Sequence, residues 1–186
     1  MPSMLVIPRV AAFTGHMVDA PDRPTPRFPP EKVEAVRKAI AEQLRKRKIG
    51  YGFSSAARGS DLLFLEELGK MGGRARVFLP FPREEFKKTS VGYGWDDRFD
   101  KALNAHEVVE LSAQVPQADK QPEAYANCNR KILEEATTKA KALNEEPLLI
   151  AVWNGDSGDG GGGTADVVRE WKNEGHEVII IDISKL

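Results

Sequence analysis

The feature of the sequence that most limits its fold is a regular alternation of short apolar runs with amphipathic segments. Several of the runs are apolar throughout, which is typical of strands buried on both faces of a parallel sheet. The expected strands are Val10–Phe13, Ile49–Phe53, Ala75–Leu79, Val108–Leu111, Leu148–Trp153 and Val178–Ile183. Because strands that alternate with helices form right-handed crossovers, the pattern predicts an α/β, three-layer Rossmann-like fold with a mainly parallel sheet of about six strands.

Between the apolar runs, apolar residues recur at helical spacing. The expected helices are Glu31–Lys48, Asp61–Met71, Trp95–Asn104, Pro122–Leu143 and Thr164–Glu174. Ser60 is the expected cap of the second of these helices, and Gly175 is the expected stop of the last. Neither an internal repeat nor a Gly/Ser-rich linker divides the chain, so we expect residues 1–186 to form a single domain.

The charge balance argues against two classes of partner. The chain has 27 basic and 28 acidic residues and a net charge of −1, so it lacks the basic excess of a protein that coats nucleic acid. No apolar run approaches the ~18 residues that are needed to span a bilayer. We therefore expect a cytoplasmic protein with neither a membrane nor a nucleic-acid partner.

Cysteine and histidine give little support to a metal site. The single cysteine, Cys128, is at helical spacing from Ile132 and is expected to be a buried structural thiol. The three histidines, His16, His106 and His176, share no ligand-like spacing with it or with one another. No metal is expected.

The most skewed segment is a glycine-rich loop, in which six of the 16 glycines fall between Gly155 and Gly163. The loop follows the expected strand that ends at Trp153 and precedes the helix that begins at Thr164. Consecutive glycines let backbone N–H groups approach an anion, and the helix start adds free N–H groups and a positive dipole end. The pattern therefore favours a phosphate-binding loop over the alternative, a flexible surface loop.

Three better-known loop motifs fit this segment less well. A Walker A loop needs a lysine, but Thr164 and Ala165 follow the last glycine. Gly158, Gly160 and Gly163 match a dinucleotide fingerprint, but that fingerprint normally opens a sheet, whereas this segment lies near the end of the chain. A calcium loop would place an acidic residue where the chain has Ala165.

A second loop with polar chemistry, Ser54–Asp61, follows the second expected strand and leads directly into a helix. Its hydroxyl groups and the cation of Arg58 suit phosphate or ribose recognition, although an ordinary capped turn is the alternative. Asp61 either hydrogen-bonds a ribose or completes the first turn of the helix. His16, at the end of the first strand, either contacts a phosphate or is structural. The proline-rich segment 21–30 is expected to be an extended loop beside the site.

Three short motifs together resemble the SLOG superfamily of Rossmann-like domains. They are Phe13-Thr14-Gly15-His16, the stretch from Gly52 to Asp61, and Gly160-Gly161-x-Gly163-Thr164. The superfamily includes the Lonely Guy phosphoribohydrolases, the DNA-processing protein A group and sensor domains of bacterial conflict systems. The resemblance implies a nucleotide or nucleotide derivative at the carboxyl ends of the strands. The implied binding residues are Thr14, Gly15, His16, Ser54, Ser55, Arg58, Gly59, Asp61, Gly160, Gly161, Gly162, Gly163, Thr164 and Asp166.

The chain departs from the hydrolases of this superfamily at one position. Their motif resembles P-G-G-x-G-T-x-x-E, and alignment of the glycines places Val167 where the hydrolases have the catalytic glutamate. Valine cannot transfer a proton, and Asp166 lies about 100° away around the helix. Arg58 and Asp166 are the remaining candidates for catalysis.

The resemblance and this departure together favour a sensor or binding module over an enzyme. The expected ligand is ADP-ribose-like or a nucleoside monophosphate, with no other cofactor. The module would work either alone or beside a further effector domain. The alternative is an enzyme that cleaves an N-glycosidic bond, as the related phosphoribohydrolases do. The resemblance also implies a homodimer.

Overall fold

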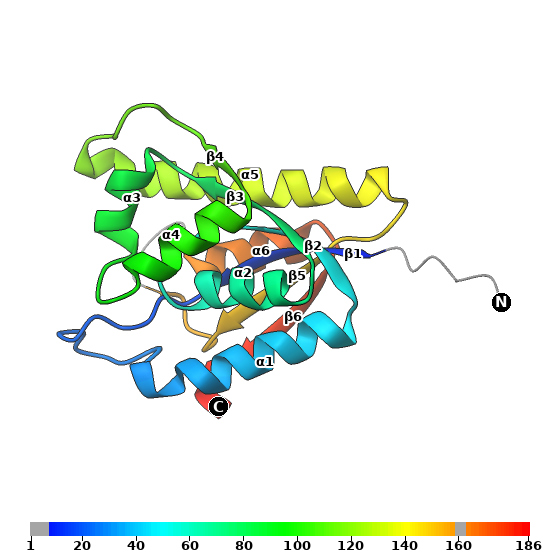
Figure 1. Ribbon diagram of the computed structural model, residues 1–186, viewed down its shortest axis with the longest axis horizontal. Helices are drawn as coiled ribbons and strands as arrows, with labels where there is room; N and C mark the ends of the chain where they lie inside the picture. The colour runs from blue at the N-terminus through cyan, green and yellow to red at the C-terminus, as the bar shows by residue number, and fades with distance from the viewer. Residues whose placement is uncertain (1–7, 159–162) are drawn as a thin grey trace.

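The computed structural model describes residues 8–158 and 163–186. Within them, a parallel sheet has the strand order β4-β3-β2-β1-β5-β6 (Figure 1). The strands are β1 (Arg9–Gly15), β2 (Ile49–Ser54), β3 (Arg74–Leu79), β4 (Glu107–Glu110), β5 (Leu148–Trp153) and β6 (Glu177–Asp182). The predicted α/β, Rossmann-like architecture is confirmed, and each expected strand is present within two residues of its expected ends.

The helices follow the expected order, with one addition. They are α1 (Val33–Lys46), α2 (Ser60–Lys70), α3 (Arg83–Ser90), α4 (Asp96–Ala105), α5 (Gln121–Ala142) and α6 (Thr164–Asn173). Short 3-10 helices cover Pro30–Lys32, Ala118–Lys120 and Ile183–Lys185. The sequence does not predict α3, because Phe86 is its only large apolar side chain and gives no helical periodicity. None of the helices in the described part of the chain is long and apolar enough to cross a membrane.

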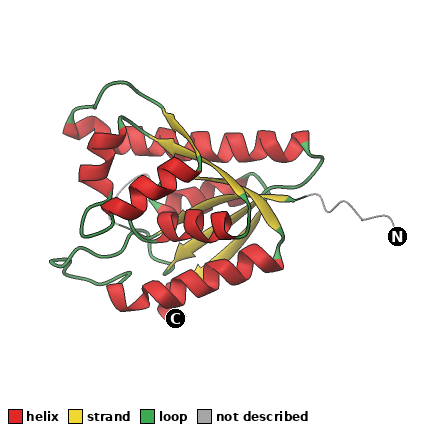
Figure 2. Ribbon diagram, viewed as in Figure 1, coloured by secondary structure: helices red, strands yellow, loops and turns green. Residues whose placement is uncertain are grey.

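Helices cover both faces of the sheet, and its inner strands are buried as the unbroken apolar runs predict, whereas the edge strands β4 and β6 are partly exposed (Figure 2). Side chains of β1 alternate between the faces: Ala11 and Phe13 pack with α1, α2 and α4, whereas Val10 and Ala12 pack with α5 and α6. The ring of Phe13 stacks on that of Phe64 in α2 with centroids 4.4 Å apart. The three layers are therefore helices, sheet and helices.

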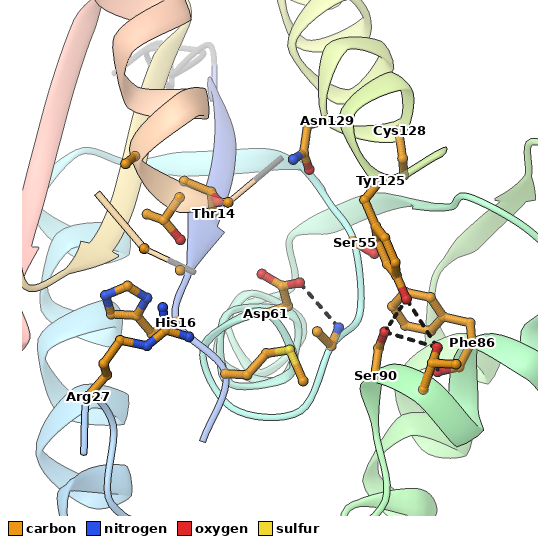
Figure 3. A pocket seen from close by; sticks show the side chains of 18 of the residues that line it. Thr14, His16, Arg27, Ser55, Asp61, Phe86, Ser90, Tyr125, Cys128 and Asn129 are labelled. Carbon is orange, nitrogen blue, oxygen red and sulfur yellow. Dashed lines mark hydrogen bonds between the residues drawn. The ribbon is translucent and has the colours of Figure 1, made fainter. Parts of the chain in front are cut away.

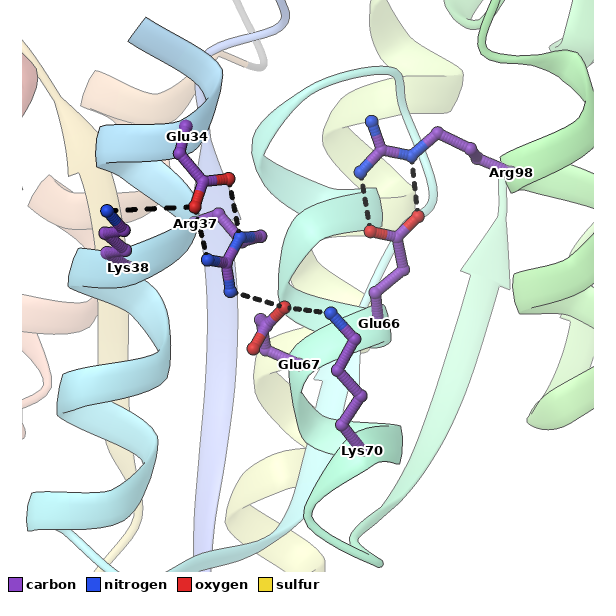
Figure 4. Close-up of polar contacts among 7 residues, drawn as sticks. All are labelled: Glu34, Arg37, Lys38, Glu66, Glu67, Lys70 and Arg98. Carbon is purple, nitrogen blue, oxygen red and sulfur yellow. Dashed lines mark hydrogen bonds and ion pairs between the residues drawn. The ribbon is translucent and has the colours of Figure 1, made fainter.

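Ion pairs join the helices on the first of these faces (Figure 4). Arg37 of α1 contacts Glu34 in its own helix and Glu67 of α2, at 3.2 Å from the latter. Arg98 of α4 donates two hydrogen bonds, of 2.7 and 2.6 Å, to the carboxylate of Glu66 in α2. The bidentate Arg98–Glu66 pair fixes geometry as well as adding energy, so it holds α4 in position against α2, and the single bond from Arg37 to Glu67 links α1 to α2.

The connectivity places a crevice beside β1. The chain runs outward from β1 through β2 and β3 to β4, and then returns to form β5 on the other side of β1. The loops that leave β1 and β5 therefore diverge in opposite directions. Ligands of open α/β sheets bind at such a switch point, outside the carboxyl ends of the strands.

Candidate ligand-binding site

A cavity of about 410 Å³ lies at this switch point (Figure 3). Its volume falls in the range of about 300–1,000 Å³ that is typical of small-molecule sites. Its walls come from the end of β1, the loop before α2, the end of α3, the first turns of α5 and the start of α6. The geometry of the site thus follows from the strand order.

Half of the residues implied by the sequence line this cavity. They are Thr14, Gly15, His16, Ser55, Asp61, Gly163 and Thr164. These residues come from the loops after β1, β2 and β5, whose carboxyl ends meet at one edge of the sheet. Gly160, Gly161 and Gly162 lie outside the described residues.

Arg58 makes hydrogen bonds to the backbone, which the sequence does not predict. Its Nε donates to the carbonyl oxygen of Val18 at 2.9 Å, and its Nη1 donates to that of Val91 at 3.0 Å. Its guanidinium also lies over the ring of Tyr93, 4.8 Å from the centroid. Arg58 is not among the cavity residues and ties the segment after β1 to the end of α3, and its pairing with a phosphate stays a prediction.

Three further implied residues also lie outside the cavity lining. Ser54 is fully buried, and its hydroxyl donates to the carbonyl oxygen of Ser55 at 2.8 Å. Asp166 forms an ion pair with Arg169 in its own helix, and its contact with ligand hydroxyl groups stays a prediction. Gly59 has a backbone role, which is described next.

Close backbone contacts bring β1 and α2 together at the site. A Cβ atom on Gly15 would lie 2.5 Å from the Cβ of Ser60, closer than real Cβ atoms approach. The Ser60 hydroxyl donates to the carbonyl oxygen of His16 at 2.7 Å. The sequence predicts Ser60 as the N-cap of α2, but the N-cap is Gly59. Gly59 has a φ of 94° and packs against Val18.

The same contacts place Asp61 at the cavity. Its side chain is buried on the first turn of α2, and its Oδ2 accepts a hydrogen bond of 3.2 Å from the backbone N–H of Ala57. Burial raises the pKa of the Asp61 carboxyl to about 7, although the N–H of Ala57 acts in the opposite direction. Both protonation states of Asp61 are therefore populated near neutral pH.

His16 lies on the other side of the cavity. Its Nε2 is 2.9 Å from Oδ1 of Asn154, the residue that follows β5. Burial lowers the pKa of the imidazole, the bond to Asn154 raises it, and the nearby cations of Arg27 and Arg23 lower it. The imidazole is therefore neutral at pH 7 and can donate or accept one hydrogen bond without bringing a charge.

Among the described lining residues, the cation is Arg27, which the sequence motifs do not predict as a binding residue. The carboxylate of Asp19 accepts hydrogen bonds from the backbone N–H groups of Arg27 and Phe28, at 2.9 and 3.0 Å. The N–H of Asp19 donates in turn to the carbonyl oxygen of Phe28 at 2.8 Å, and the Phe28 ring is fully buried. The sequence signal for Arg27 is Phe28, an aromatic residue within the proline-rich segment. Because the buried Phe28 ring anchors the loop, it places the neighbouring Arg27 at the site.

A cluster of hydroxyl groups on the opposite wall was also missed. The phenol oxygen of Tyr125 lies 2.7 Å from the Ser90 hydroxyl and 3.1 Å from that of Thr89. Phe86 is close by in α3, and Cys128 follows one turn along α5. The Cys128 thiol donates to the carbonyl oxygen of Phe78 at 3.3 Å, and burial raises its pKa to about 12, so it is the structural thiol that the sequence predicts.

Comparisons with known proteins find similarity in fold. No family model matches the chain, and no curated protein matches it. DNA processing protein A from Streptococcus pneumoniae is 13% identical with a TM-score of 0.46, over 92% of this chain and 58% of that one. The Helicobacter pylori DNA processing protein A is 13% identical with a TM-score of 0.39, over 96% and 78% of the two chains. The Moco carrier protein of Chlamydomonas reinhardtii is 9% identical with a TM-score of 0.37, over 96% and 92%.

The sequence motifs of the chain resemble those of the SLOG superfamily. DNA processing protein A, which belongs to one of the groups named for that resemblance, is among these similar structures. The chain spans about 58% of the length of the Streptococcus pneumoniae protein. One expectation is corrected: the exclusion of nucleic acid on the ground of net charge does not stand, because the Helicobacter pylori protein binds single-stranded DNA.

Proposed function

We propose that this chain is a binding or sensor module for a nucleotide-derived ligand, ADP-ribose-like or a nucleoside monophosphate, held in the cavity beside β1. The observation that carries the proposal is the division of the cavity into two chemically different ends. One end has a cation and a helix start, and the other has aromatic rings and hydroxyl groups. A phosphorylated nucleoside has the same division.

The first end suits a phosphate. Arg27 supplies a fixed positive charge, and α6 begins at the cavity with Gly163 and Thr164. The backbone N–H groups of Asp166 and Val167 bond to the carbonyl oxygen of Gly163 at 3.1 and 3.3 Å, so those of Thr164 and Ala165 are the ones at the helix start that a ligand would meet. An anion there gains from both hydrogen bonds and the helix dipole.

The second end suits a base and a sugar. Phe86 and Tyr125 offer aromatic surface, and Thr89 and Ser90 add hydroxyl groups that both donate and accept hydrogen bonds. Most of this wall is uncharged, which favours a neutral heterocycle over a second anion. The ligand would thus lie across the cavity with its phosphate toward α6.

Calorimetric titration with ADP-ribose and with AMP tests this proposal. Arg27→Gln removes a charged hydrogen-bond partner that contributes about 1.5–3 kcal/mol, and we expect the dissociation constant to rise roughly 10- to 100-fold. Arg45→Gln is the matched control, because Arg45 is exposed in the last turn of α1. Equal affinity of the Arg27→Gln and wild-type proteins would overturn the proposal, as would the absence of binding across a broad nucleotide panel.

A second candidate function, cleavage of an N-glycosidic bond, is favoured by Asp61. Val167 is buried among apolar side chains and cannot act on a ligand, but Asp61 is a carboxyl group at the cavity whose pKa of about 7 suits proton transfer. Release of adenine from AMP, measured by chromatography and abolished by Asp61→Asn, would support turnover. Binding without release of base supports the sensor instead.

A further inference from the structure

Asp61 occupies an unusual position between the two ends of the cavity. Figure 3 shows its carboxyl group with His16 and Arg27 on one side and Tyr125 and Ser90 on the other. The side chain is 8% exposed. Among the described residues, its hydrogen-bond partner is one backbone N–H, that of Ala57, and no ion pair joins it to a cation.

A carboxylate in this position has one hydrogen-bond donor among the described residues, the N–H of Ala57. A buried carboxylate can accept about four hydrogen bonds, two at each oxygen, and leaving these unmade is costly. Arg27 could supply a charge, but it lies at the end of the cavity where an anionic ligand would compete for it. A bound ligand is therefore the natural source of donors for Asp61.

On the basis of the proposed function, we propose that Asp61 determines specificity by accepting hydrogen bonds from a vicinal pair of hydroxyl groups, so that the site takes ribonucleotides in preference to their deoxyribose counterparts. A neutral diol offers two donors, which fit one to each carboxylate oxygen. A phosphate in the same place would be repelled by the carboxylate of Asp61. The ligand thus lies with phosphate at α6, ribose over Asp61 and base toward Tyr125.

This arrangement links binding to pH. The hydroxyl groups donate, so they favour the ionised carboxylate, whose pKa burial raises to about 7 in the free protein. Among the described residues, the other titratable or charged groups at the cavity are His16 at the end of β1, Arg27, Tyr125 and Cys128 on α5, and Asp156 after β5. If Asp61 alone governs the change, the affinity for a diol ligand rises about tenfold from pH 6 to pH 8, because the ionised fraction rises by that factor.

Two sets of probes separate Asp61 from its neighbours. AMP, 2′-deoxy-AMP and 3′-deoxy-AMP differ only in the hydroxyl pair, and a site that hydrogen-bonds a hydroxyl group discriminates strongly against an analogue without it. ADP-ribose has a diphosphate diester that does not titrate between pH 6 and pH 8, so its pH dependence reports on the protein. Each ligand is titrated by calorimetry at pH 6, 7 and 8.

We expect wild-type protein to bind AMP at least tenfold more tightly than either deoxy analogue. Asp61→Asn keeps the size of the side chain and an acceptor for the N–H of Ala57, and we expect it to lose both the preference and the Asp61 share of the pH dependence. Arg45→Gln, matched as an exposed control, should keep both. Thermal unfolding of each variant shows that it is folded.

The outcomes distinguish this inference from the proposed function. Equal affinity of wild-type protein for AMP and its deoxy analogues would overturn the role of Asp61 and leave nucleotide binding intact. Retention of the preference by Asp61→Asn would overturn it as well. Failure of wild-type protein to bind any of the probes would overturn the proposed function and this inference together.

Discussion

At the scale of single residues, burial of the Asp61 carboxyl affects stability even without a ligand. Its pKa is about 7 in the folded protein, against 3.8 for an ordinary, solvent-exposed aspartate. A group whose pKa is raised on folding contributes fully to the free energy of unfolding at pH values below its pKa in the unfolded chain. This contribution is lost as the pH rises through its pKa in the folded protein. The stability contribution of Asp61 therefore falls between about pH 4 and about pH 7.

Asp61→Asn removes this titration, and its effect on stability should depend on pH. We expect the free energy of unfolding of wild-type protein, relative to Asp61→Asn, to fall by at most about 1.4 kcal/mol for each pH unit from pH 4 to pH 7, and to level off above pH 7. Denaturant unfolding of both proteins at several pH values measures the difference. A difference that does not vary with pH would contradict the assignment of a raised pKa to Asp61.

Gly15 is required where β1 meets α2. In Gly15→Ala, the new Cβ would lie 2.5 Å from the Cβ of Ser60, so we expect the free energy of unfolding to fall by about 1–3 kcal/mol, as overpacking does. Gly69→Ala, inside α2, is the control: its Cβ would make ordinary contacts of 3.6 Å, and the change should stabilise the helix by up to about 1 kcal/mol. Equal stability of Gly15→Ala and wild-type protein would contradict the requirement for glycine where β1 meets α2.

At the scale of elements, the loop from Asp19 to Phe28 carries the cation of the site. Asp19→Ala leaves two backbone N–H groups without their acceptor, so we expect a loss of about 1–3 kcal/mol in stability together with weaker ADP-ribose binding as Arg27 loses its position. Asp22→Ala in the same loop is exposed and should change stability by no more than about 0.5 kcal/mol. Calorimetry and thermal unfolding of both variants test this. Unchanged affinity in Asp19→Ala would separate the loop from the site.

The elements themselves could be predicted because their signals are local. Unbroken apolar runs mark the strands, and helical spacing marks five of the helices, whereas α3 has one large apolar residue and gives no periodicity. The site was predictable only in part. Thr14, His16, Asp61 and Thr164 lie at or after the carboxyl ends of strands, and these ends must meet in a parallel sheet. Arg27 and the Tyr125 hydroxyl reach the cavity through tertiary contacts that sequence spacing does not encode.

At the scale of the whole molecule, the strand order joins these parts. The return of the chain from β4 to β5 beside β1 brings the end of β1, the start of α2 and the start of α6 to one cavity. Two apolar clusters, one on each face of the sheet, include residues from elements throughout the chain. We therefore propose that residues 1–186 fold as a single cooperative unit.

Calorimetric unfolding tests this proposal. We expect one transition, with equal calorimetric and van't Hoff enthalpies, because α1, α2, α5 and α6 all pack on the same sheet. Two resolved transitions would show separate domains. The homodimer that the resemblance implies is also a proposal, and sedimentation of the same sample tests it: a single species of 20.6 kDa would contradict it.

The most direct test of the central claim is a crystal structure of the protein with ADP-ribose bound. The account predicts a ligand in the cavity beside β1, with phosphate oxygens within hydrogen-bond distance of Arg27 and of the backbone N–H groups at the start of α6. A ribose hydroxyl pair should face the Asp61 carboxylate. ADP-ribose bound elsewhere on the molecule, or in this cavity with its phosphates directed toward Tyr125, would contradict the account.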